Sequence, residues 1–565
     1  MNFTTPSGFR DVLADEAARR ETASYRVQQL LAENGYVPVE TPTLEIMDVM
    51  GAGGHIPGTP FKLFDSRGDL LALRPDVTLQ IARMCATRLA GQPGPFRFRY
   101  QERVFREAEG RPQAEAREMT QVGVELIGEA GAQADAEVVA LFAESLLCAG
   151  AKDFRISIAT VGVLRALLAS CGVNGEWKEG VLSAYHASNF VKLDELTSEG
   201  GARAAGVPPV FASAIRSLSR IRGGREAVER VRELVSPLGC QDGLDDLDRV
   251  LDMLAEKGLS DRILVDFSVM SSFDYYTGIV FVAFAPALGA PLGSGGRYDN
   301  TIGAFGESRP AAGFAFYLDQ ALAADAAPTE DAATNDRPLR IAVPKGSLNP
   351  DSIACLKACG FDTTGLADPG RQLIIRNPGV DYIIVRPSDA PVFVELGAAD
   401  CGICGEDSLL EAASGVVELV DLKFGACRFI VAEPEGAAER VAERYRTRGS
   451  VRVATKYPRI TEAFYAKKGE QVEIVKLHGN IELGPLTGLS ERIVDITATG
   501  RTLRENNLVV VDEVLSSTAR FLANPCSFRT DPRVVELAEK LREGVREGRW
   551  EASVIAGGAQ TPQSS

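Results

Sequence analysis

The stretch Val494-Asp-Ile-Thr-Ala-Thr-Gly-Arg-Thr-Leu503 places an acid, three threonines and a glycine at the end of an apolar run. It predicts a strand from Arg492 to Ile496, then a turn, then the start of a helix. Such a turn offers several backbone N–H groups and threonine hydroxyls to one anion, and Gly500 permits a close approach. Asp495 stands where it can accept hydrogen bonds from sugar hydroxyls. The stretch therefore predicts a ribose-5-phosphate site, with an ordinary strand-to-helix turn as the alternative.

Six further motifs precede this loop in the sequence. They are Arg340-Ile-Ala-Val-Pro-Lys-Gly-Ser347, Asp381-Tyr-Ile-Ile-Val-Arg-Pro-Ser-Asp-Ala-Pro391, Gly397-Ala-Ala-Asp-Cys-Gly-Ile-Cys-Gly405, Phe424-Gly-Ala-Cys-Arg428, Arg452-Val-Ala-Thr-Lys-Tyr-Pro458 and Glu473-Ile-Val-Lys-Leu-His-Gly-Asn-Ile-Glu482. From about Arg337 to about Gly548 the chain resembles the short-form catalytic subunit of ATP phosphoribosyltransferase, the first enzyme of histidine biosynthesis. The resemblance implies two α/β lobes with a cleft between them, like periplasmic binding proteins. The strand–helix alternation itself predicts a mainly parallel sheet.

The resemblance also implies a reaction, in which adenine N1 of ATP attacks phosphoribosyl pyrophosphate and magnesium pyrophosphate leaves. Mg²⁺ would accompany the phosphorylated substrates. Asp495 would bind the ribose, and the 5-phosphate would lie in the loop formed by Thr497, Ala498, Thr499, Gly500, Arg501 and Thr502. The candidates for binding pyrophosphate and triphosphate are Lys345, Arg371 and Arg386, while Glu482 and Asp400 are candidates for the adenine or the metal. A ligand-binding module without catalysis is the alternative for this part of the chain.

Length and composition limit the class of protein. A chain of 565 residues, 45% apolar and 24% charged, predicts three or four globular domains. No apolar run is long enough for a membrane span, and the first residues lack a signal peptide, so we expect a cytoplasmic enzyme. A net charge of −16 argues against a nucleic-acid partner. The ten scattered cysteines predict reduced thiols, and Cys401 and Cys404 are expected in a buried strand rather than in a metal site.

The chain divides at a polar stretch rich in alanine and aspartate. Residues 323–337 read as a linker between an N-terminal domain, residues 1–322, and a two-lobed domain, residues 338–548. The tail, residues 549–565, is expected to be disordered. In the N-terminal domain, the pattern predicts an amphipathic helix from about Asp15 to Asn34 and a mostly helical region from about Asp135 to Lys257.

The N-terminal domain carries motifs of its own. They include Leu70-Leu-Ala-Leu-Arg-Pro-Asp-Val-Thr78, Phe96-Arg-Phe-Arg-Tyr-Gln-Glu-Arg-Val-Phe-Arg106, Phe273-Asp-Tyr-Tyr-Thr-Gly-Ile-Val-Phe281, Gly295-Gly-Arg-Tyr-Asp299 and Ala312-Gly-Phe-Ala-Phe-Tyr-Leu318. These resemble the catalytic domain of histidyl-tRNA synthetase, which implies a class II α+β fold built on an antiparallel sheet. Where the synthetases have arginine, this chain has Ser271, and the family's Glu-Arg pair is replaced by Asp319 and Gln320. Because neutral side chains stabilise a transferring phosphate poorly, we expect no aminoacylation and no tRNA partner.

The histidine-binding residues of the synthetases, by contrast, have counterparts here. They are Asp76, Thr78, Arg106, Gln121, Glu125, Tyr276 and Tyr298. The alternative is a folded relic whose polar residues only bond one another. A synthetase-like domain without synthetase chemistry resembles the regulatory subunit that accompanies the short-form transferase. The sequence is thus expected to fuse the two subunits into one chain, with L-histidine as inhibitor and a homo-oligomer, a tetramer, as the assembly.

Overall fold

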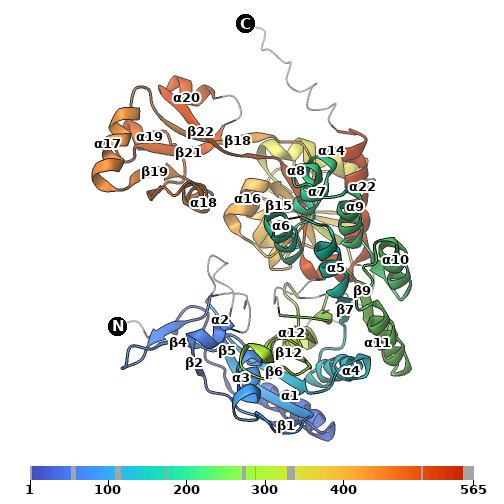
Figure 1. Cartoon of the computed structure of the whole chain (residues 1–565). Helices are drawn as coiled ribbons and strands as arrows, with labels where there is room; N and C mark the ends of the chain where they lie inside the picture. Colours follow the sequence, from blue (N-terminus) through green and yellow to red (C-terminus); the bar gives the residue numbers. More distant parts are fainter. Residues whose placement is uncertain are drawn as a thin grey trace. The chain divides into compact units, whose positions relative to one another are not determined.

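The computed structural model describes residues 3–52, 59–107, 116–173, 175–269, 275–286, 288–326, 337–497 and 500–550. The chain forms two compact units. Unit 1 comprises residues 1–337 together with 524–532, and unit 2 comprises 338–523 together with 533–565 (Figure 1). The boundary after residue 337 was expected, but the return of nine later residues to unit 1 was not.

Unit 1 is built on a nine-stranded sheet. Its strand order is β1 (Val37–Pro38), β5 (Phe96–Phe105), β6 (Glu118–Ile127), β12 (Ala311–Tyr317), β11 (Gly293–Arg297), β10 (Ile279–Phe284), β7 (Arg155–Thr160), β9 (Ile263–Asp266) and β8 (Arg222–Gly223). Only the pairs β1–β5 and β7–β9 among these strands are parallel. The predicted antiparallel sheet is therefore confirmed. A smaller antiparallel sheet has the order β2 (Leu44–Ile46), β4 (Leu70–Leu73), β3 (Lys62–Phe64).

Helices cover this sheet through apolar faces. Helix α1 runs over Ala14–Glu33, close to the predicted bounds, and α4 over Ala132–Ala149. The Phe142 ring of α4 lies 5.4 Å from the ring of Phe281 in β10 and 5.1 Å from that of Phe314 in β12. The other helices of the unit are α2 (Met47–Ala52), α3 (Thr78–Thr87), α5 (Gly162–Ser170), α6 (Gly175–His186), α7 (Phe190–Thr197), α8 (Glu199–Ala204), α9 (Pro209–Leu218), α10 (Glu226–Val235), α11 (Leu244–Glu256) and α12 (Leu318–Ala326).

The last element of unit 1 is α21 (Pro525–Thr530), which comes from late in the sequence. The Asn524 side chain begins this helix by accepting two of its backbone N–H groups. Arg529 is buried and lies 3.6 Å from the carboxylate of Asp266, at the end of β9. Arg222 lies 3.3 Å from the same carboxylate and donates to the Phe528 carbonyl at 2.8 Å. These bonds connect α21 to the far end of the large sheet.

Unit 2 contains two mixed sheets. The six-stranded sheet has the order β14 (Ile374–Asn377), β15 (Val380–Val385), β13 (Leu339–Pro344), β16 (Cys401–Gly405), β23 (Ala519–Ala523), β17 (Val417–Asp421). The five-stranded sheet has the order β20 (Val472–Lys476), β19 (Val451–Thr455), β21 (Arg492–Thr497), β18 (Cys427–Pro434), β22 (Leu508–Ser517). Cys401 and Cys404 are buried in β16 as expected.

The expectation of a mainly parallel sheet was wrong. The pairs β13–β15 and β13–β16 are parallel, but β14, β17 and β23 join the six-stranded sheet through antiparallel pairs. The five-stranded sheet is mixed in the same way: β19 pairs parallel with β20 and β21, whereas β18 pairs antiparallel with β21 and β22. The reason is that the chain passes between the sheets twice, from β17 to β18 and from β22 to β23, without a crossover helix. A strand that enters without such a helix is free to pair antiparallel.

Helices flank both sheets of unit 2. Figure 1 shows α17 (Ala438–Arg448), α18 (Pro458–Lys468), α19 (Leu483–Leu486) and α20 (Arg501–Glu505) gathered around the five-stranded sheet. The remaining helices are α14 (Asn349–Ala358), α15 (Ala390–Glu395), α16 (Glu406–Ala412) and α22 (Pro532–Arg546). No helix among the residues that the structure describes is long and apolar enough to cross a membrane.

Two expected segment bounds need correction. Helix α12 continues to Ala326, so the first four residues of the expected linker are helical, while 327–336 lie outside the described residues. The expected disordered tail begins too early, because Trp550 is buried. Its indole N–H donates to the Leu422 carbonyl at 3.0 Å, and its ring occupies the space where a Cβ on Gly544 would lie. Residues 551–565 lie outside the described residues.

We predict that Trp550→Ala destabilises unit 2 by roughly 3–5 kcal/mol, because the substitution empties a buried aromatic site and leaves the Leu422 carbonyl without its donor. Trp550→Phe keeps most of the ring and should cost less. Differential scanning calorimetry of the full chain measures both. An unchanged unfolding temperature for Trp550→Ala would show that the C-terminal residues do not contribute to the core.

Candidate functional sites

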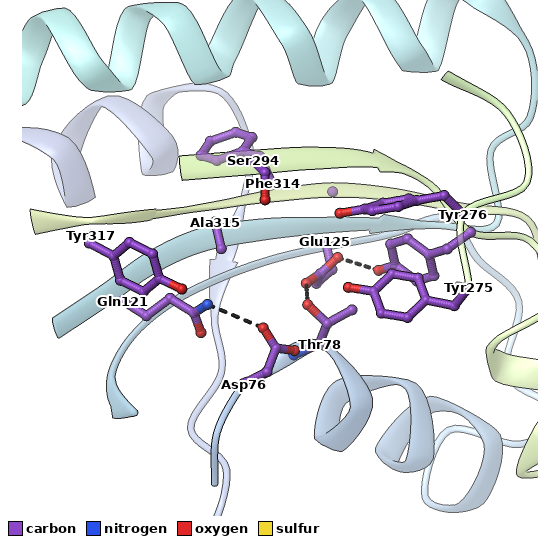
Figure 2. A pocket seen from close by; sticks show the side chains of 12 residues that line it. Asp76, Thr78, Gln121, Glu125, Tyr275, Tyr276, Ser294, Phe314, Ala315 and Tyr317 are labelled. Atoms are coloured by element: carbon purple, nitrogen blue, oxygen red, sulfur yellow. Dashed lines mark hydrogen bonds between the residues drawn. The ribbon is translucent and has the colours of Figure 1, made fainter. Parts of the chain in front are cut away.

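Unit 1 contains a pocket on one face of its large sheet, shown in Figure 2. Strands β6, β11 and β12 form its floor, and the residues before α3 and before β10 form its walls. Its lining consists of Asp76, Thr78, Gln121, Glu125, Tyr275, Tyr276, Ser294, Tyr298, Gly313, Phe314, Ala315 and Tyr317. Carboxylates, an amide and phenols thus converge on one cavity, which is the pattern of a site for a small polar ligand.

Glu125 is the centre of the polar network. The Thr78 hydroxyl donates to one carboxylate oxygen at 2.7 Å, and the Tyr298 hydroxyl donates to the other. Glu125 is buried, and this burial raises the pKa of its carboxyl to about 8 even though both hydrogen bonds lower it. The group is therefore able to hold a proton near neutral pH, and a ligand's charge or hydrogen bonds would decide its state.

Glycines in the floor make room for these side chains. A Cβ on Gly313 of β12 would lie 2.0 Å from a Glu125 carboxylate oxygen. A Cβ on Gly296 of β11 would lie 2.6 Å from the Tyr276 ring. Neither contact is sterically possible, so glycine at both positions is required by the pocket, although the backbone at these points is ordinary strand.

Asp76 organises the opposite wall. Its carboxylate accepts the Thr78 backbone N–H at 2.8 Å and the Gln121 amide at 3.2 Å. The other side-chain atom of Gln121, its carbonyl oxygen, is buried without a hydrogen-bond partner. Because a buried acceptor costs free energy when unpaired, this oxygen indicates that the pocket is shaped for a donor from a ligand.

Six of the seven predicted histidine-binding residues line the pocket. The seventh, Arg106, lies beside it: its guanidinium donates to the Pro75 carbonyl at 3.0 Å and stands 5.6 Å from the ring centroid of the lining residue Tyr317. Sequence reasoning missed Tyr275, whose ring lies 4.8 Å from Tyr276 and 5.7 Å from Tyr298, as well as Ser294 and Tyr317. Two features of the sequence could have indicated these residues: the adjacent tyrosines Tyr275 and Tyr276, and the alternation of side chains between the two faces of β11 and β12.

The structure describes only some of the residues that replace the synthetase arginine (Ser271) and Glu-Arg pair (Asp319 and Gln320). Asp319, in the first turn of α12, forms an ion pair with Arg20 of α1. It therefore has a structural partner in place of a substrate. Ser271 lies outside the described residues.

The predicted ribose-phosphate loop joins β21 to α20 in unit 2. The strand ends at Thr497, one residue beyond the predicted bound, and α20 starts at Arg501. The Thr497 hydroxyl oxygen accepts the Gly500 N–H at 2.8 Å, and Gly500 has a φ of 65°, a value that favours glycine. Ala498 and Thr499 lie outside the described residues.

The helical end of the loop is open to solvent. The Arg501 guanidinium bonds Glu505 at 2.8 Å, one turn further along α20, and the Thr502 side chain is exposed. The Thr502 side chain is thus accessible to a ligand at the helical end of the loop.

Asp495 lies at the entrance to this turn. Burial raises the pKa of its carboxyl to about 6, and the nearby charge of Glu482 adds to the effect, while the Ile496 N–H and the charge of Lys456 oppose it. Thr455 at the end of β19 pairs with Val494 of β21, which brings Lys456 next to Asp495. The structure therefore brings the charged side chains of Asp495, Glu482 and Lys456 close together at one end of the strands of the five-stranded sheet.

The cationic candidates lie on the six-stranded sheet. Lys345 and Arg386 each follow the end of a strand, and these strands, β13 and β15, are parallel neighbours. The Lys345 backbone N–H donates to the Val385 carbonyl at 2.8 Å, and both side chains are exposed. Arg371 lies in an exposed turn before β14. The structure brings Lys345 and Arg386 together at the carboxyl edge of the sheet, where α/β folds commonly bind ligands.

The suggestion that Asp400 faces a substrate or metal was wrong. Asp400 is fully buried before β16, at the opposite edge of the sheet, where its carboxylate pairs with the Arg340 guanidinium at 3.1 Å and accepts the Arg340 backbone N–H at 2.9 Å. Its role is to join the starts of two strands. The described residues contain no group of three or more His, Cys, Asp or Glu side chains arranged to hold a metal ion.

Comparison with known proteins identifies both units. A family model described as histidyl-tRNA synthetase matches residues 8–321, and one described as ATP phosphoribosyltransferase matches residues 386–543. An ATP phosphoribosyltransferase of Rubrobacter xylanophilus is 50% identical over 213 residues, which cover 38% of this chain and 98% of that protein. The chain belongs to the ATP phosphoribosyltransferase family.

The N-terminal part of this transferase has relatives of its own. An ATP phosphoribosyltransferase regulatory subunit of Moorella thermoacetica is 39% identical over 326 residues, 56% of this chain and 81% of that protein. The solved structure of an ATP phosphoribosyltransferase regulatory subunit/histidyl-tRNA synthetase from Bacillus halodurans C has a TM-score of 0.53 at 28% identity. It covers 68% of this chain and 93% of that chain. The predicted fusion of regulatory and catalytic subunits is therefore confirmed.

We predict that transferase activity loses efficiency in acid through Asp495, whose raised pKa leaves the carboxyl protonated and uncharged below about pH 6. The kcat/KM for phosphoribosyl pyrophosphate should rise between pH 5 and pH 7 with an inflection near 6. Asp495→Asn should remove this inflection and leave any inflection due to the substrate itself. The same inflection in both proteins would mean that the substrate, not Asp495, causes it.

Proposed function

We propose that unit 2 transfers the phosphoribosyl group of phosphoribosyl pyrophosphate to N1 of the adenine of ATP, giving N1-(5-phosphoribosyl)-ATP and pyrophosphate. The observation that carries this proposal is the Asp495 carboxylate in β21, close in the chain to the hydrogen bond from the Gly500 N–H to the Thr497 hydroxyl. The 50% identity to a transferase over the matched region supports it. A binding module without catalysis has no need of an acid placed before a loop rich in threonine and glycine.

Displacement at the anomeric carbon proceeds through an oxocarbenium-like transition state with negative charge growing on the leaving pyrophosphate. The enzyme's work is therefore positioning and electrostatic stabilisation. Asp495 would accept hydrogen bonds from the ribose hydroxyls, while the loop and the Thr502 hydroxyl would hold the 5-phosphate. Lys345 and Arg386, and less directly Arg371, would neutralise pyrophosphate and triphosphate. Mg²⁺ would arrive bound to the phosphorylated substrates and neutralise the leaving group.

The two sheets of unit 2 would act as two lobes, as in periplasmic binding proteins. The ribose loop belongs to the five-stranded sheet, whereas Lys345 and Arg386 belong to the six-stranded sheet. The two chain passages, from β17 to β18 and from β22 to β23, would serve as the hinge. Lobe closure would bring the leaving pyrophosphate to the cations and exclude water from the reacting carbon.

For unit 1 we propose that L-histidine binds the pocket of Figure 2 and inhibits the transferase. The Asp76 carboxylate and the unpaired Gln121 oxygen would take the α-ammonium, and Glu125 would bond an imidazole nitrogen. In a relic pocket, the polar groups would satisfy one another, and the Gln121 oxygen speaks against that alternative. Coupling to the transferase requires that histidine prefer one of two states of the enzyme. We also propose a homotetramer, which would present four copies of each unit.

For the catalytic loop, we predict that Asp495→Asn and Thr502→Ala each lower kcat/KM for phosphoribosyl pyrophosphate by roughly 10²-fold, the scale of losing one well-placed transition-state hydrogen-bonding group. Arg446→Ala is the matched control and should change it little, because its guanidinium pairs with Glu443 on α17, outside the loop. Formation of phosphoribosyl-ATP is the measurement. Wild-type kinetics in both loop variants would remove the loop from the active site, and an inactive wild type would favour the binding-module alternative.

For regulation, we predict that Glu125→Gln raises the histidine concentration for half-inhibition by 10-fold or more, because the neutral amide cannot reproduce the carboxyl's bonds to Thr78 and Tyr298 and to a ligand. The activity without histidine should stay within twofold. Equilibrium binding of histidine and the mass in solution should be measured beside the inhibition. Equal inhibition of both proteins would place the feedback site elsewhere, and a fully active monomer would defeat the tetramer.

A further inference from the structure

One side chain joins the two sheets of unit 2. Glu411 belongs to α16, which follows β16 of the six-stranded sheet. Its two carboxylate oxygens accept the backbone N–H of Arg459 at 3.3 Å and of Ile460 at 3.2 Å. Both N–H groups belong to the first turn of α18, which lies between β19 and β20 of the five-stranded sheet. A single carboxylate thus connects a helix of one sheet to a helix of the other.

Helix α18 has no cap of its own at this end. Its N-cap residue, Tyr457, makes no side-chain capping bond, and the next residue, Pro458, has no N–H. The N–H groups of Arg459 and Ile460 are therefore the first donors that need a partner. Glu411 supplies it from a distant part of the chain, with a charge that suits the positive end of the helix dipole. Burial raises the pKa of the Glu411 carboxyl and these N–H groups lower it.

The capped end of α18 adjoins the ribose acid. Strand β19 ends at Thr455, which pairs with Val494, so the residues that lead into α18 run beside Asp495. The charge of Lys456 lowers the pKa of the Asp495 carboxyl, and the charge of Asp495 contributes to raising the pKa of Tyr457. The position of the first turn of α18 therefore sets the positions of Lys456 and Tyr457 relative to Asp495.

We propose that Glu411 is a positioning residue for the transfer reaction: by capping α18 from the other sheet, it holds Lys456 and Tyr457 in place beside Asp495. The inference rests on the proposed transferase function of unit 2. Glu411 itself touches no substrate. Its effect is to hold the first turn of α18 at the point where the ribose acid lies. A shift of about 1 Å at such a point is enough to lower a rate by as much as 10²-fold.

The test compares Glu411→Ala, which removes both acceptors, with Glu411→Gln, which keeps one. We expect kcat/KM for phosphoribosyl pyrophosphate to fall about 10-fold in Glu411→Ala and about 3-fold in Glu411→Gln. The inflection near pH 6 should move upward in Glu411→Ala, because Lys456, whose charge lowers the pKa of Asp495, is no longer held beside it. Loss of stability alone would lower the unfolding temperature without moving that inflection.

Glu395→Gln is the matched control. Glu395 also accepts a backbone N–H, that of Gly415 at 2.8 Å, but both residues belong to the same side of unit 2, between α15 and β17. This variant should keep the wild-type kcat/KM and pH profile. An unchanged kcat/KM and inflection in Glu411→Ala, or an equal loss in Glu395→Gln, would overturn the positioning role. Should Glu411→Ala fail to fold, a wild-type profile in Glu411→Gln would overturn it. A wild type without transferase activity would overturn the proposed function as well.

Discussion

The carboxylate of Asp266 is the charge around which one end of unit 1 is assembled. It is only 1% exposed, and burial by itself would raise its pKa, yet Arg222, Arg529 and the Ser268 donors keep the pKa below its usual value. A buried carboxylate that loses such partners costs several kcal/mol. Because Arg529 comes from α21, the end of the large sheet is electrostatically complete only with a segment that follows the catalytic sheets in the sequence.

Both candidate sites depend on a carboxylate that is held away from water. Burial has the largest effect on the pKa of Glu125 and of Asp495, and it raises both. The two carboxyls differ in the groups that lower the pKa again. At Glu125 the opposing groups are neutral hydroxyls, and the charge of Asp76 adds to the effect of burial, so the carboxyl stays close to the point of protonation at neutral pH. Asp495 has a backbone donor and a nearby lysine, so it is ionised at neutral pH.

The sequence predicted best those parts of the sites whose residues are neighbours in the chain. The strand, turn and helix around Gly500 lie within a residue or two of their predicted bounds, because alternating apolar residues and a turn glycine are local signals. The pocket residues were found through their resemblance to a family. Ser294 was missed because it reaches the pocket only through the pairing of β11 with β12, and Tyr317 because the pairing of β12 with β6 places it opposite Gln121.

Other features depended on long-range pairing and could not be read from local patterns. The antiparallel entry of β23 between β16 and β17 joins segments far apart in the chain, and no periodicity reports it. Asp400 was a candidate for the adenine or the metal, but the parallel pairing of β13 with β16 places it beside Arg340. Trp550 lies in a stretch of tail-like composition, and only its bond to Leu422 shows that it belongs to the core.

Because residues 524–532 return to unit 1, neither unit is formed by one continuous segment of the chain. The backbone crosses from one to the other three times, after residues 337, 523 and 532. A protease that cuts once between residues 326 and 337 would therefore yield two polypeptides but not two separate bodies, since α21 would still be bound through Arg529 and Asp266. Separating the two units would take cuts after residues 337, 523 and 532, and α21 would then remain with unit 1 only through noncovalent contacts such as the Arg529–Asp266 pair.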